Sequence, residues 1–109
     1  LVLNQAIGKY TGWGGILFLS DQDVIQEEVH ITGYPGDKGL KQMWSMNHKV
    51  RAVATEEFEY KIDTYAGQSG SAIWVNKWSV PYVVGIHTLG GDVKNSGVRL
   101  SRKTLTDLI

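Results

Sequence analysis

The residues best suited to do chemistry lie in a polar, glycine-bearing turn at positions 63–73, which runs directly into an apolar segment. Gly67 and Gly70 lie on either side of Ser69. Glycine tolerates backbone dihedrals that other residues avoid, so the Ser69 hydroxyl can stand clear of the chain while nearby N–H groups converge. This arrangement suits acyl transfer with Ser69 as the nucleophile. The alternative is a tight hairpin turn with ordinary serines, since such turns occur in many β proteins.

A second serine motif, the Gly-x-Ser-x-Gly elbow of α/β-hydrolases, does not match this turn. The second glycine stands at the wrong offset, and the residues after Ser69 are strand-forming rather than helix-forming. A β-type setting for Ser69 is therefore favoured.

Three further segments accompany the turn at 63–73, namely residues 33–38, 43–45 and 84–88. In content and order, the four segments resemble motifs of the glutamyl endopeptidase branch of the chymotrypsin-fold serine proteases. The resemblance covers nearly the whole chain, but only the later part of such an enzyme. It implies a serine endopeptidase acting on polypeptides after Glu or Asp. The catalytic His and Asp of this family lie upstream on a first β-barrel, and neither is expected within these residues.

The resemblance also implies the roles of individual residues. The N–H groups of Gly67 and Ser69 would form the oxyanion hole, while Thr64 and His87 would line the pocket that binds the acidic side chain. His87 is expected to be a binder and not the base. Two alternatives stay open: a histidine in an apolar strand is usually a hydrogen-bonded core residue, and Thr64 can bond to its own turn.

The composition excludes several other functions. Eleven Lys and Arg residues balance eleven Asp and Glu residues, and neither sign forms a run, so we expect no nucleic acid and no membrane as a partner. The absence of cysteine excludes disulfides and thiolate zinc sites. No apolar run approaches the roughly 20 residues of a membrane-spanning helix. We expect no cofactor and no metal, and the resemblance implies secretion.

Alternation of apolar and polar residues predicts most of the elements. Strands are expected within 16–19, 28–34, 41–54, 57–63, 72–75, 82–87 and 98–100, with 8–15 as a loop and 20–23 as a turn. Met43 and Trp44 are expected to pack inward, and His30 and His48 to lie on polar faces. Ser101 or Thr104 is a candidate N-cap for a terminal helix.

These elements predict an all-β fold, a small antiparallel Greek-key β-barrel with a short C-terminal helix. By the resemblance it is the second barrel of a two-barrel protease. Residues 1–25 are expected to be a strand remnant and an interbarrel connection, and residues 26–109 the barrel itself.

Two functional hypotheses follow from these observations. In the first, the chain is a serine endopeptidase half-domain that is inactive alone. Its His and Asp would come from a first barrel in the same precursor or on a separate chain. Self-association is the other way to cover the apolar face that a second barrel presents to the first. In the second, the chain is a non-catalytic peptide-binding or interaction module. The residues upstream in the parent protein discriminate between them.

Overall fold

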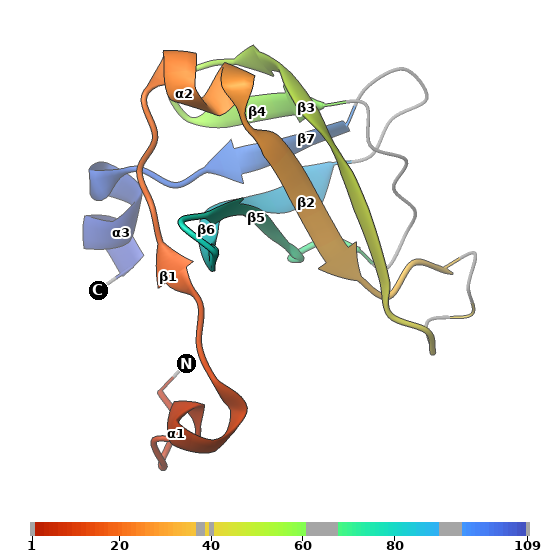
Figure 1. Cartoon of the computed structure of the whole chain (residues 1–109), viewed down its shortest axis with the longest axis vertical. Helices are drawn as coiled ribbons and strands as arrows, with labels where there is room; N and C mark the ends of the chain where they lie inside the picture. The colour runs from red at the N-terminus through yellow and green to blue at the C-terminus, as the bar shows by residue number, and fades with distance from the viewer. Residues whose placement is uncertain (1, 37–38, 40, 61–67, 90–94, 109) are drawn as a thin grey trace.

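The computed structural model of the chain describes residues 2–36, 39, 41–60, 68–89 and 95–108. Within them, one seven-stranded sheet has the order β1-β6-β5-β2-β3-β4-β7, and an additional pairing joins β6 to β7. That pairing closes the six strands other than β1 into an antiparallel barrel (Figure 1). The expected all-β Greek-key barrel is confirmed.

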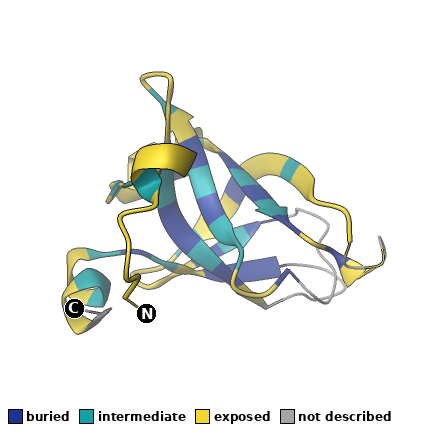
Figure 2. Ribbon diagram, turned by 90° about the horizontal axis from the view of Figure 1, so that it is seen from below, coloured by how far each residue is buried: buried dark blue, intermediate teal, exposed yellow. Residues whose placement is uncertain are grey.

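The barrel strands follow the predicted alternation closely. They are β2 (Glu28–Gly33), β3 (Trp44–Val53), β4 (Glu57–Tyr60), β5 (Ala72–Lys77), β6 (Val80–Leu89) and β7 (Asn95–Arg99). Along β2 and β4, buried residues alternate with more exposed ones, because successive side chains of a strand point to opposite faces. The inward side chains form one apolar core, which runs along the middle of the strands in Figure 2.

The hairpin of β5 and β6 brings two distant parts of the sequence together. Its register runs from Lys77 opposite Val80 to Ala72 opposite Ile86. Trp78 and Ser79 form the two-residue loop, both with positive φ, as a type I′ hairpin turn requires. This register places the residues that follow Ser69 beside His87.

The N-terminal residues depart from the expected strand and loop. Val2 and Leu3 belong to no strand, and α1 (Gly8–Thr11) stands where a loop was predicted. A strand needs a hydrogen-bonding neighbour, and within the described residues this arm extends away from the barrel (Figure 1). β1 (Gly15–Ile16) is the first segment to join the sheet, in parallel with β6. The division at residue 25 stays a prediction.

A short helix, α2 (Asp21–Gln26), replaces the turn expected at 20–23. The Ser20 hydroxyl accepts a hydrogen bond from the N–H of Asp23 at 3.3 Å, the usual contact of an N-cap. Val24, only 1% exposed, joins the barrel core. This burial stabilises a helix that is too short to be stable alone.

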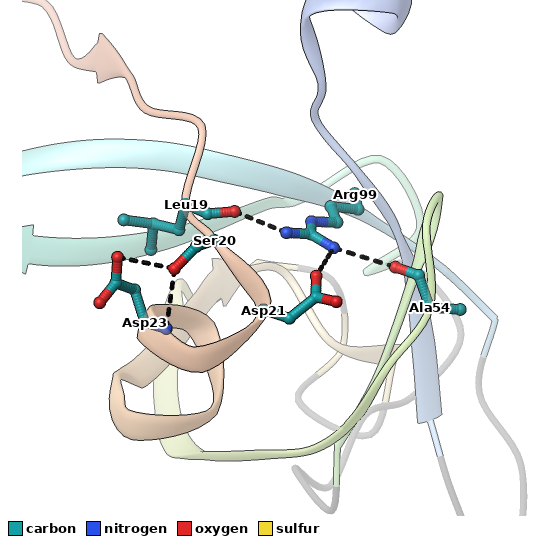
Figure 3. Close-up of polar contacts among 6 residues, drawn as sticks. All are labelled: Leu19, Ser20, Asp21, Asp23, Ala54 and Arg99. Carbon is teal, nitrogen blue, oxygen red and sulfur yellow. Dashed lines mark hydrogen bonds and ion pairs between the residues drawn. The ribbon is translucent and has the colours of Figure 1, made fainter.

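Arg99 of β7 fastens the segment before α2 to the barrel (Figure 3). Its guanidinium donates to the carbonyl oxygens of Leu19 (2.5 Å) and Ala54 (3.1 Å) and to the carboxylate of Asp21 (2.5 Å). One side chain thus joins three segments that are far apart in the sequence.

The prediction that Met43 and Trp44 pack inward is wrong. Met43 is 65% exposed and Trp44 is 43% exposed. Trp44 lies opposite Gly33 at the end of the β2–β3 pairing, and within the described residues the β3–β4 pairing runs from Val50 to Val53. Among the described residues, the start of β3 is therefore paired on one side only, by β2, and its side chains are less covered than those of a strand between two neighbours.

The C-terminal helix is confirmed as α3 (Arg102–Leu108), with Ser101 as its N-cap. Among the described residues, no helix combines the length and the apolar character needed to span a membrane.

Candidate active site

The candidate nucleophile lies on a tight turn at the start of β5. The N–H of Ser71 donates to the carbonyl oxygen of Gln68 at 3.0 Å, so Ser69 and Gly70 are the two central residues. Gly70 has φ +87°, which the third position of a type II turn requires and which glycine adopts without strain. Ser69 is exposed, while Gln68 is fully buried. The turn therefore presents Ser69 to solvent, while the buried Gln68 anchors the start of the turn.

Strand β6 holds the two residues that follow Ser69 in this turn. The N–H of Gly70 donates to the carbonyl oxygen of His87 at 2.8 Å, and the N–H of His87 donates to the carbonyl oxygen of Ser71 at 2.9 Å. These two bonds extend the pairing of β5 and β6 into the turn. The backbone positions of Ser69 and His87 are therefore coupled.

The end of β2 also packs closely against the turn. A Cβ atom added to Gly33 would collide with the Oγ of Ser71 and would lie 3.7 Å from the Cγ of Gln68. Glycine at the end of β2 thus lets the turn approach the barrel wall.

His87 lies inside the barrel, 2% exposed. Its Nδ1 is 2.5 Å from the hydroxyl oxygen of Tyr60, which is 0% exposed. Burial lowers the pKa of the imidazole and raises the pKa of the phenol, because removal from water disfavours the charged form of each group. The pair is therefore neutral near pH 7.

The other two histidines lie elsewhere on the barrel. The His30 ring stacks on Trp74, with centroids 4.4 Å apart. It is half-buried on β2, while His48 is exposed on β3 as expected. Within the described residues, neither imidazole is hydrogen-bonded to Ser69.

Of the four predicted site residues, Ser69 and His87 are described, and the backbone brings them together. Thr64 and Gly67 lie outside the described residues, so their expected roles stay predictions. In the part of the chain that is described, no group of three or more His, Cys, Asp or Glu residues could hold a metal.

Tyr60 is the residue of this site that the sequence interpretation missed. Alternation within 57–63 already placed Phe58, Tyr60 and Ile62 on one face. A tyrosine on an inward face needs a partner for its hydroxyl, and the alternative left open for His87 was a hydrogen-bonded core residue. The need of the Tyr60 hydroxyl for a buried partner was therefore the signal that could have paired it with His87.

No family model matches the chain, but its sequence is similar to several curated proteins. It is 42% identical, over 90% of its length, to a glutamyl endopeptidase of Staphylococcus epidermidis. It is 30% identical to a glutamyl endopeptidase of Bacillus licheniformis and 31% identical to an extracellular metalloprotease of Bacillus subtilis, each over 97% of its length.

A solved structure of a Glu endopeptidase matches the fold with a TM-score of 0.82, at 27% identity over 96% of this chain. The chain is a glutamyl endopeptidase-like domain. This domain spans 34% to 36% of the length of these three curated relatives and 49% of the solved chain. The glutamyl endopeptidase-like domain thus corresponds to about half of a chymotrypsin-like protease, as the resemblance implied.

Proposed function

We propose that this domain is the second β-barrel of a serine endopeptidase that cleaves after Glu or Asp, with Ser69 as its nucleophile. The observation that carries the proposal is the turn at Ser69. An exposed hydroxyl stands on a turn that is hydrogen-bonded to the strand of the buried His87, within a glutamyl endopeptidase-like fold.

In the proposed reaction, the Ser69 Oγ attacks the carbonyl carbon of the scissile bond while an imidazole takes the hydroxyl proton. The same imidazole then protonates the leaving amine as the C–N bond breaks, and water hydrolyses the acyl-enzyme by the same two steps. The N–H groups of Gly67 and Ser69 are the proposed oxyanion donors. Loss of one such donor costs about 2.7–4 kcal/mol of transition-state stabilisation.

The base and its orienting carboxylate are proposed to come from a first β-barrel, in the same precursor or on a separate chain. The positions of the three histidines support this part of the proposal. His30 stacks on Trp74, His48 is exposed on β3, and His87 is bonded through Nδ1 to Tyr60.

Recognition of the acidic side chain is assigned to His87 and Thr64. An imidazole N–H and a hydroxyl are directed donors for a carboxylate, and charge-assisted hydrogen bonds are about twice as strong as neutral ones. Secretion is also proposed, because one relative is named an extracellular metalloprotease.

A fluorophosphonate probe tests the role of Ser69. We expect no labelling of the 109-residue chain alone, because an unassisted serine hydroxyl is a weak nucleophile. The complete protein should be labelled stoichiometrically, and Ser69→Ala should abolish the labelling. Ser45→Ala is the matched control, since Ser45 lies exposed on β3.

Rapid labelling of the isolated chain would show that this chain supplies its own base. A complete protein that binds peptides without being labelled would instead be the non-catalytic module.

Peptide substrates test the specificity pocket. The complete protein should prefer Glu or Asp on the acyl side, and His87→Ala or Thr64→Val should cost about 1.5–3 kcal/mol in kcat/KM for such substrates. A preference for Arg, Lys or large apolar residues would refute the pocket assignment.

A further inference from the structure

We propose that Tyr60 is a positioning residue whose hydroxyl donates a hydrogen bond to Nδ1 of His87. This bond holds the imidazole proton on Nε2, where the N–H can donate a hydrogen bond to a substrate carboxylate. The inference rests on the proposed function of His87 as the acid-binding residue and deepens it. It assigns a specificity role to a residue that does not itself touch the substrate.

The first support is the geometry of the pair. The two heavy atoms lie 2.5 Å apart, and the rings are tilted at 47° with centroids 5.9 Å apart. Tyr60 belongs to β4 and His87 to β6, and β7 lies between these strands, paired with both. The contact therefore crosses the barrel interior at the point where the sheet closes.

The intervening strand leaves room for this contact at one position. Gly97 of β7 lies opposite His87, and a Cβ added there would collide with Cδ1 of Ile73, lie 2.7 Å from the Ile86 carbonyl oxygen and lie 3.1 Å from the Tyr60 hydroxyl oxygen. A side chain at Gly97 would thus crowd the Tyr60 hydroxyl as well as Ile73 and the backbone of β6, whereas glycine leaves this space open.

The second support is the direction of the hydrogen bond. Within the described residues, the Tyr60 hydroxyl has His87 Nδ1 as its one hydrogen-bond partner. If the hydroxyl accepted from an Nδ1–H, its own proton would be buried without an acceptor, which is costly. If it donates instead, both groups are satisfied. Burial favours the protonated phenol and the neutral imidazole, the two forms that this direction requires.

The consequence is found on the other ring nitrogen. A neutral imidazole carries one N–H, so an accepting Nδ1 leaves the proton on Nε2. Within the described residues, Nε2 has no hydrogen-bond partner. A carboxylate meeting it would accept from Nε2–H, whereas the opposite tautomer would face the carboxylate with a lone pair. The Tyr60 hydroxyl thus determines whether His87 attracts an acidic side chain.

Nitrogen-15 NMR of the complete protein, labelled at histidine, tests the tautomer without a substrate. The His87 signals are assigned by their loss in His87→Gln. We expect a protonated Nε2 and an unprotonated Nδ1 near neutral pH, and in Tyr60→Phe a mixture of both tautomers. An Nδ1–H tautomer in the unmodified protein would overturn the inference, as would a spectrum of His87 that Tyr60→Phe leaves unchanged.

Paired peptides with Glu or its neutral isostere Gln on the acyl side test the effect on specificity. Tyr60→Phe should raise KM for the Glu peptide about tenfold and lower the Glu-to-Gln ratio of kcat/KM. Labelling of Ser69 and kcat should be largely retained. Tyr82→Phe is the matched control, because it removes a phenolic oxygen from a half-buried position on β6. An unchanged ratio in Tyr60→Phe would overturn the positioning role.

The two measurements separate this inference from the function on which it rests. If the unmodified protein shows no preference for acidic peptides, the proposed function fails. The NMR spectrum still decides whether Tyr60 sets the tautomer of His87.

Discussion

At the scale of single residues, the distinctive feature is a tyrosine and a histidine that are both buried and bonded to each other. Burial alone penalises a polar side chain, but each member here provides the partner that the other needs. The backbone of His87 also carries the two hydrogen bonds that anchor the turn of Ser69. One residue therefore connects the core, the proposed pocket and the proposed nucleophile.

Burial of His87 makes stability depend on pH. Because its pKa in the folded state is below the ordinary value of 6.5, the unfolded state binds a proton that the folded state does not as pH falls through this region. The free energy of unfolding should be highest above about pH 6.5 and decrease as pH falls, by at most about 1.4 kcal/mol per pH unit from this group. Urea unfolding from about pH 8 to about pH 5 measures the slope.

The variant His87→Gln should flatten this pH dependence. His48→Gln, which changes an exposed histidine on β3, is the control and should leave the slope in place. An equal slope in His87→Gln and in the unmodified chain would place the titrating group elsewhere.

At the scale of elements, the barrel depends on contacts that tie its N-terminal segment to β7. Leu17 and Leu19 pack against the core, and Arg99 binds the carbonyl oxygen of Leu19 beside them. The guanidinium also lies over the Phe58 ring, 5.8 Å from its centroid. These contacts position the start of α2, whose Val24 completes the core.

Replacing Arg99 by Met should lower the free energy of unfolding by about 1–3 kcal/mol, since the carbonyl oxygens of Leu19 and Ala54 would lose a charged donor. Met retains much of the aliphatic stem, so the loss reports on the guanidinium. Urea unfolding measures the change, and limited proteolysis should cut the segment before α2 sooner. Asp21→Asn should cost under about 1 kcal/mol, because that carboxylate is 73% exposed. A larger loss in Asp21→Asn than in Arg99→Met would contradict this account.

At the scale of the whole molecule, the apolar residues that remain exposed gather toward the N-terminus. Trp13 is 82% exposed and Tyr10 is 90% exposed. In the run at 16–19, Ile16 is 49% exposed and Phe18 is 37% exposed. The exposed arm is visible in Figure 2. The chain also spans only about half of a solved Glu endopeptidase.

We propose that this arm is a contact surface for a first barrel or for a second copy of the chain. Sedimentation at low micromolar concentration should therefore show self-association, or binding to a separately produced first barrel. Trp13→Ser should weaken either association, whereas Trp44→Ser, which changes an exposed tryptophan on β3, should not, because β1 pairs with β6 and not with β3 in the described residues. A monomer with no affinity for the first barrel would refute the proposal.

The sequence by itself determined the barrel class, most strands and the capped terminal helix. These depend on local rules: alternation along 28–34 and 57–63 and turn residues between runs predict strands, and Ser101 before an apolar pattern predicts a helix start. The glycine-bearing turn at 63–73 singled out Ser69, and the family resemblance singled out His87. The roles of Thr64 and Gly67 stay predictions.

Only the tertiary structure decided which distant residues meet. Tyr60 and His87 are 27 positions apart, and they touch because β7 closes the barrel between them. Arg99 reaches Leu19 across 80 positions, and α2 is stabilised by the core that receives Val24. Met43 and Trp44 are exposed at and just before the start of β3, where β2 is the one paired neighbour within the described residues. Each outcome depends on strand order and register, which are properties of the closed sheet as a whole and are absent from any short segment of the chain.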